Sequence, residues 1–169
     1  DYLARFSHLT RQILELNQHD FILLEDELKF IENYLKIQQI RFDQPFLFSI
    51  KTDPKLGEKG QILIPPMITQ PFLENAIEHG IINKNQQGRI DLNISADDQY
   101  LHINIEDNGV GRESAEFQKR TKKHRSMATQ ITQDRLENLQ RSFRKQANMK
   151  IEDIVNRNLI LGTRVIFKL

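Results

Sequence analysis

The sequence lacks cysteine, and its charges nearly cancel. Its 169 residues contain no Cys, and 24 Lys and Arg stand against 23 Asp and Glu, which leaves a formal net charge of +1. A chain without cysteine has no disulfides and no thiolate metal sites, which is compatible with a reducing compartment. The charge balance gives no reason to expect nucleic acid as a partner.

Long apolar runs are also missing. No stretch approaches the ~20 apolar residues of a membrane-spanning helix, so we expect a membrane connection only through a segment upstream of this chain. The sequence starts in mid-pattern at Asp1 without a Met, and we therefore expect it to be part of a longer protein. Its hydrophobic residues make up 38% of the chain, enough for the core of one domain with a helical extension.

Two amphipathic helices are predicted at the start of the chain. Apolar residues recur at spacings of three and four over residues 1–17, and two apolar stripes run along residues 25–42. A helix with two apolar stripes is covered on two sides. The pattern alone is that of an ordinary helical hairpin.

The remainder of the chain alternates between apolar and polar residues, as strands with one buried face do. Asp97-Asp98 joins two of these runs into a hairpin, and helices are predicted from Gln70 onward and over 129–146. We therefore predict an α/β (α+β) two-layer sandwich: a mixed, mostly antiparallel sheet with helices on one face, preceded by the helical hairpin. The predicted strands cover residues 46–51, 89–96, 99–107, 150–156 and 159–169.

Two stretches carry the chemistry. In the predicted helix that begins at Gln70, Asn75 and His79 lie one turn apart at the edge of the apolar face, and Gly80 is the expected helix stop. Asp107 ends a strand on the same side as its apolar residues, where an acid is costly unless it is paired.

Glycines complete this pattern. Gly109 and Gly111 follow Asp107 directly and allow the backbone to approach a ligand closely. An amide-bearing helix edge beside a strand-end carboxylate and a glycine loop indicates a nucleotide pocket.

These residues resemble the GHKL superfamily of ATP-binding domains. Asn75 is similar to the magnesium-holding asparagine of its N box, and Asp107-x-Gly109-x-Gly111 to its G1 box, whose aspartate accepts a hydrogen bond from adenine. The long form of the N box over residues 70–80 resembles the LytS-type sensor histidine kinases in particular. Residues 24–42 resemble the linker helix that precedes the ATP-binding domain in that family, where the preceding helices form a dimerisation bundle.

The resemblance implies ATP and Mg²⁺ as cofactors, with Asn75 as the metal ligand. Glu74 and His79 are possible further contacts, although Glu74 also fits a surface charge and His79 a structural role. Thr163 is implied to support Asp107, or is a buried Thr bonded to backbone. The basic segment Lys119 to Arg125 corresponds to the ATP lid, or is a solvated loop. The implied nucleotide-binding residues are Asn75, His79, Asp107, Gly109, Gly111, Lys122, Arg125, Thr129 and Thr163.

The sequence departs from the family pattern in three places. Ala128 stands where the second glycine box has a Gly, so the tightest loop geometry there is in doubt. Pro71 replaces the glutamate with which hydrolytic members activate water, which favours phosphotransfer to a protein. The acceptor motif Asn-Pro-His-Phe-Leu-Phe-Asn is not in the chain, and His8 lacks its context.

The implied function is transfer of the γ-phosphoryl of Mg-ATP to a histidine upstream of this chain, and from there to a response regulator. The expected organisation is residues 1–43 as partial dimerisation helices of a homodimer and 44–169 as the ATP-binding domain. The expected location is the cytoplasmic portion of a bacterial inner-membrane sensor. The alternatives are a GHKL ATP hydrolase and a nucleotide-sensing interaction module with weak catalysis.

Overall fold

The computed structural model describes all residues except 1, 60, 83–86, 112–129, 145 and 158. Its centre is a five-stranded sheet with the order β2-β4-β5-β7-β6. β2 pairs with β4 in parallel, and the other neighbours are antiparallel. The strands are β2 (Leu47–Thr52), β4 (Arg89–Ala96), β5 (Leu101–Asp107), β6 (Asn148–Asn156) and β7 (Leu159–Lys168).

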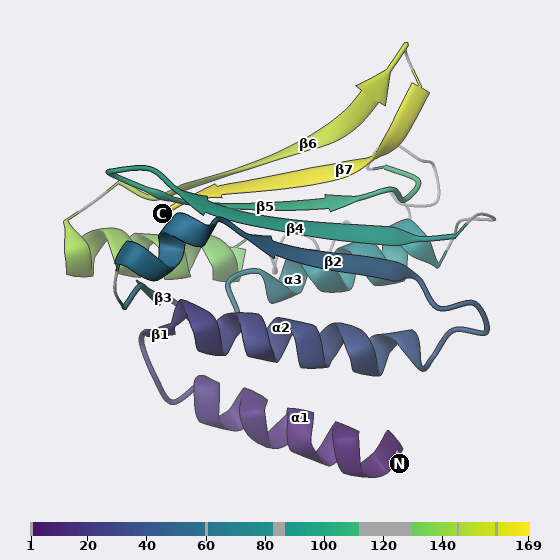
Figure 1. The fold of residues 1–169 in the computed structure, drawn as a ribbon, viewed down its shortest axis with the longest axis horizontal. Helices are drawn as coiled ribbons and strands as arrows, with labels where there is room; N and C mark the ends of the chain where they lie inside the picture. The colour runs from purple at the N-terminus through teal and green to yellow at the C-terminus, as the bar shows by residue number, and fades with distance from the viewer. Residues whose placement is uncertain (1, 60, 83–86, 112–129, 145, 158) are drawn as a thin grey trace.

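The helices lie on one face of this sheet, as predicted (Figure 1). α1 (Tyr2–Leu16) packs against α2 (Leu24–Gln39), and α2 lies between α1 and the sheet (Figure 1). This arrangement explains the two apolar stripes of α2, because both are buried. α3 (Gln70–Asn75) and an unlabelled helix over residues 130–143 complete the layer.

The core forms where the inward residues of the sheet meet these helices. Leu92 lies opposite Ile105, and Ile94 opposite Ile103, all of them buried. The Phe72 ring of α3 meets the Phe167 ring of β7 edge to face, with centroids 5.5 Å apart. The alternation read from the sequence therefore assigns the buried face correctly, and the predicted fold class is confirmed.

Three short elements do not follow from the sequence patterns. β1 (Ile22–Leu23) pairs antiparallel with β3 (Leu63–Ile64), which fastens the start of α2 to the chain that leads to α3. A 3-10 helix, η1 (Pro54–Lys59), follows β2. Among the described residues, no helix is both long enough and apolar enough to cross a membrane.

The predicted helix stop at Gly80 is wrong. After Asn75 the chain continues as a π-helix, η2 (Ala76–Ile81), which includes Gly80 and extends the predicted helix. The Ile82 amide donates to the Ile77 carbonyl at 3.0 Å, the i to i+5 spacing of a π turn. Glycine here serves a close backbone contact and not a cap.

Candidate functional site

The N-box helix and the glycine loop meet at two glycines. A Cβ on Gly109 would lie 2.4 Å from the Gly80 Cα and 2.7 Å from Asp107 Oδ1. A Cβ on Gly80 would lie 3.1 Å from the same carboxylate oxygen. Only glycine allows this approach at Gly109, because real Cβ atoms do not come so near other atoms. The structure thus brings Gly80, Asp107 and Gly109 together from separate parts of the chain.

Asp107 is the buried acid of this cluster, with 8% of its surface exposed. Its Oδ1 accepts a hydrogen bond from the Gly109 amide at 2.8 Å. Thr163 of β7 lies directly opposite Asp107 across the ladder. Gly162 passes the Asp107 backbone so closely that a Cβ there would lie 1.8 Å from the Asp107 carbonyl oxygen. A carboxylate enclosed in this way is held in one place.

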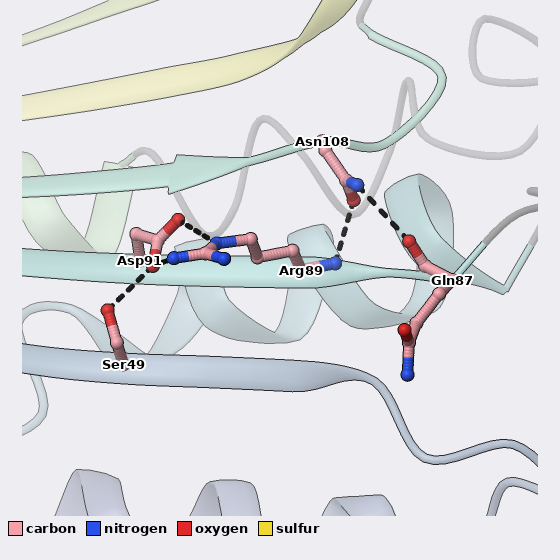
Figure 2. Close-up of polar contacts among 5 residues, drawn as sticks. All are labelled: Ser49, Gln87, Arg89, Asp91 and Asn108. Carbon is pink, nitrogen blue, oxygen red and sulfur yellow. Dashed lines mark hydrogen bonds and ion pairs between the residues drawn. The ribbon is translucent and has the colours of Figure 1, made fainter.

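Asn108 fixes the glycine loop to the first residues of β4 (Figure 2). Its side-chain oxygen accepts from the Arg89 amide at 2.7 Å, and its side-chain nitrogen donates to the Gln87 carbonyl at 3.2 Å. The Asn108 amide also donates to the Arg89 carbonyl at 3.1 Å. Sequence reasoning missed this residue, although an Asn between an inward acid and a glycine is a common sign of a side chain that bonds nearby backbone.

An ion-paired group lies beside the Asn108 hydrogen bonds on the outer face of the sheet (Figure 2). Arg89 pairs with Asp91 at 2.5 Å, and Ser49 of β2 donates to Asp91 at 2.6 Å. The Arg89 hydrogen bond holds the pKa of Asp91 below its ordinary value. The start of β4 is therefore fastened to β2 on one side and to the glycine loop on the other.

The loop after Asp107 needs its second glycine for a different reason. Gly111 has a φ of +74°, a left-handed conformation in which a Cβ is disfavoured. A Cβ there would also lie 2.2 Å from the Ile160 side chain of β7. The two glycines of the motif therefore serve a close approach and a left-handed turn, respectively.

The N-box side chains differ in their surroundings. Asn75, the last residue of α3, is half-buried. Its side-chain amide makes no hydrogen bond to another residue within the described part of the chain. Glu74 is exposed and accepts from the Gln70 side chain at 2.7 Å, which favours a structural partner for this carboxylate. His79 is half-buried in η2. Asn75 has the hard oxygen ligand that Mg²⁺ prefers.

No cluster of three or more His, Cys, Asp or Glu that fits a metal occurs among the described residues. Mg²⁺ that is bound with a nucleotide usually takes one or two protein oxygens, and phosphate and water fill its other positions. The implied contacts Lys122, Arg125 and Thr129, and Ala128 of the second glycine box, lie outside the described residues.

Comparisons with known sequences point to sensor kinases. The family model described as histidine kinase matches residues 1–46. The sensor protein LytS of Staphylococcus epidermidis is 32% identical over 109 residues, which cover 64% of this chain and 18% of that protein. The sensor protein kinase HptS of Staphylococcus aureus is 34% identical over 116 residues, which cover 69% of this chain and 21% of that protein. The chain thus spans roughly a fifth of these relatives.

Solved structures show the same fold. The histidine kinase domain of the Erythrobacter litoralis blue-light activated kinase has a TM-score of 0.61 at 13% identity, covering 100% of this chain and 74% of that one. The mycobacterial sensor histidine kinase MprB has a TM-score of 0.58 at 13% identity, covering 89% of this chain and 96% of that one.

The fold is the one seen in solved histidine kinase domains. Within this class, the sequence relatives are sensor proteins of the LytS and HptS kind at 32% and 34% identity. The resemblance to LytS-type sensor histidine kinases is therefore confirmed.

Proposed function

We propose that this chain is the Mg-ATP-binding catalytic part of a two-component sensor histidine kinase. The observation that supports this most directly is the contact of Gly80 with Gly109 against the buried Asp107 carboxylate. It joins the end of the N-box helix to the loop after β5, which supports the assignment of the Asn75 amide and the Asp107 carboxylate to one site.

Each group has a role that follows from its chemistry. A carboxylate has two oxygens that can accept several hydrogen bonds, so Asp107 can accept from the Gly109 amide and also suit the exocyclic amino group of adenine. The Asn75 oxygen fits Mg²⁺ that is shared with phosphates. Phosphoryl transfer depends mainly on positioning and charge neutralisation, so these groups, together with Lys122 and Arg125, account for most of what the protein must supply.

The phosphoryl acceptor is a histidine outside this chain, because the acceptor motif of the family is absent from the sequence. We infer that residues 1–43 are part of the helical bundle of a homodimer and that residues 44–169 form the ATP-binding domain. In the whole protein the phosphoryl group passes on to a response regulator, and this chain lies on the cytoplasmic side of the membrane.

Calorimetry with ADP, with and without Mg²⁺, tests the site. Asp107→Asn keeps the shape but presents a donor where an acceptor is needed, and should weaken binding roughly ten- to a hundredfold. Asn75→Ala should remove the effect of Mg²⁺. Asp26→Asn, which changes an exposed carboxylate of α2, is the matched control and should bind as wild type does. Wild-type affinity for Asp107→Asn would refute the adenine assignment.

Labelling with γ-labelled ATP tests the direction of transfer. The chain alone should bind the nucleotide without labelling itself, and addition of the upstream segment should restore an acid-labile label. Acid-labile label on a histidine of this chain alone would contradict an external acceptor. Rapid release of free phosphate would favour the ATP hydrolase.

A further inference from the structure

A buried acid in α2 contacts the chain that leads into the N-box helix. Glu27 is 1% exposed, the most enclosed carboxylate among the described residues. Its Oε2 accepts from the Met67 amide at 2.8 Å, and its Oε1 accepts from the Thr69 hydroxyl at 3.2 Å. An acid in such surroundings is costly unless its bonds are satisfied, and these two bonds offset part of that cost.

Met67 is held from its other side as well. The Arg135 guanidinium, from the helix over residues 130–143, donates to the Met67 carbonyl at 2.8 Å. Met67 has a φ of +54°, a left-handed conformation that is uncommon for a non-glycine residue. Glu27 therefore bonds the amide of Met67 and Arg135 bonds its carbonyl, and together they fix the turn before α3.

The start of α3 depends on the same carboxylate. Thr69 is the N-cap residue of α3, its side chain makes no capping bond, and its hydroxyl donates to Glu27. Thr69 has no exposed surface, so water cannot replace that partner. The helix that ends at Asn75 is therefore anchored to α2 and not capped by its own residue.

α2 meets the N box again at its other end. Arg41, just after α2, donates to Glu78 of η2 at 2.7 Å. Both side chains are partly exposed, so this pair is weaker than the Glu27 contacts. The α2 region thus contacts the N-box segment at two places. Glu27 bonds residues before α3 begins, and Arg41 bonds Glu78, which follows Asn75.

We propose that Glu27 is a positioning residue that couples α2 to the nucleotide site by setting where the helix carrying Asn75 begins. The coupling rests on the proposed function of Asn75 and Asp107. Because Arg135 binds the same residue, the link extends to the helix that follows residues 112–129. A shift of α2 would be transmitted to Asn75 through the Met67 turn, without direct contact between α2 and the nucleotide.

Two substitutions at Glu27 test whether its hydrogen bonds position α3: one keeps them and the other removes them. Glu27→Gln keeps an acceptor for the Met67 amide, while its new NH₂ group can donate to Thr69, and it should bind Mg-ADP within about twofold of wild type. Glu27→Ala leaves both donors unpaired and should weaken Mg-ADP binding about tenfold or more. Glu32→Ala, on the same helix in an exposed ion pair with Lys36, is the matched control and should bind as wild type does.

The measurement is calorimetry with Mg-ADP at a temperature at which circular dichroism shows every variant folded. Thr69→Val, nearly the same shape, removes one of the two donors and should weaken binding a few-fold; it serves if Glu27→Ala does not fold. Wild-type affinity in a folded Glu27→Ala or Thr69→Val would overturn the positioning role.

Hydrogen exchange distinguishes this role from the proposed function. Glu27→Ala should lose amide protection over residues 67–82 while β5 and β7 keep theirs. If wild type failed to bind Mg-ADP, the proposed function would fall, and the exchange pattern would still decide whether Glu27 positions α3. Uniform loss of protection across the sheet would mean that Glu27 serves stability alone.

Discussion

Gly80 of η2 and Gly109 after β5 are in direct backbone contact, with room for no side chain on Gly109. Gly109→Ala places a methyl group against the Gly80 backbone and Asp107 Oδ1, neither of which is a flexible side-chain end. Separation of the two segments should lower the free energy of unfolding by about 1–3 kcal/mol. It should also abolish detectable Mg-ADP binding, measured by calorimetry beside a thermal melt.

The matched control for this change is Gly57→Ala in η1, where a Cβ would meet nothing within 4 Å. That variant should keep wild-type stability within about 0.5 kcal/mol, and it should keep nucleotide affinity. Wild-type binding by Gly109→Ala would show that the contact between the two segments is not needed for the site.

Glu27 makes the stability of the chain depend on pH. Burial raises the pKa of Glu27 from 4.5 to about 7, although its bonds to Met67 and Thr69 and the nearby Arg135 oppose the shift. The folded state therefore keeps this proton up to about pH 7, whereas the unfolded chain releases it near 4.5. The contribution is fully present below the lower value and is lost as the pH rises through the upper one.

The side chain of Glu27→Gln cannot titrate. The melting temperature of this variant should therefore increase relative to that of wild type as the pH rises from about 5 to 8. The difference in free energy of unfolding between Glu27→Gln and wild type can change by at most about 1.4 kcal/mol per pH unit, because one proton is involved. Glu25→Gln, an exposed carboxylate of the same helix, controls for the loss of a negative charge. A constant difference between Glu27→Gln and wild type over this range would contradict the raised pKa.

The sequence was informative where a residue type conflicted with its pattern. The position of Asp107 on the apolar side of its strand predicts an enclosed acid, and the structure confirms that it is buried. Glu27 gives the same signal, because it shares a helical face with Leu24, Ile31 and Tyr34, yet this was overlooked. An acid on the apolar face of a helix could have been singled out by the same reasoning.

Other features of the fold cannot be predicted from hydrophobic periodicity. β1 and β3 are too short to alternate, and their pairing depends on the distant chain that each one meets. The parallel pairing of β2 with β4 is equally a product of topology. The left-handed Met67 is imposed by Glu27 and Arg135, so no local preference of Met predicts it.

Asn108 tests whether the glycine loop must be fixed to β4 for the site to work. Asn108→Ala removes the acceptor for the Arg89 amide and the donor to the Gln87 carbonyl, and should destabilise the chain by about 1–2 kcal/mol. Since Asp107 and Gly109 flank this residue, Mg-ADP affinity should fall several-fold in chains that are still folded. Asn93→Ala, in the middle of β4, is the control, because it changes the same residue type on the same strand away from the loop. Calorimetry and thermal melts of both variants decide the outcome: equal affinities for the two would mean that the loop needs no anchor at β4.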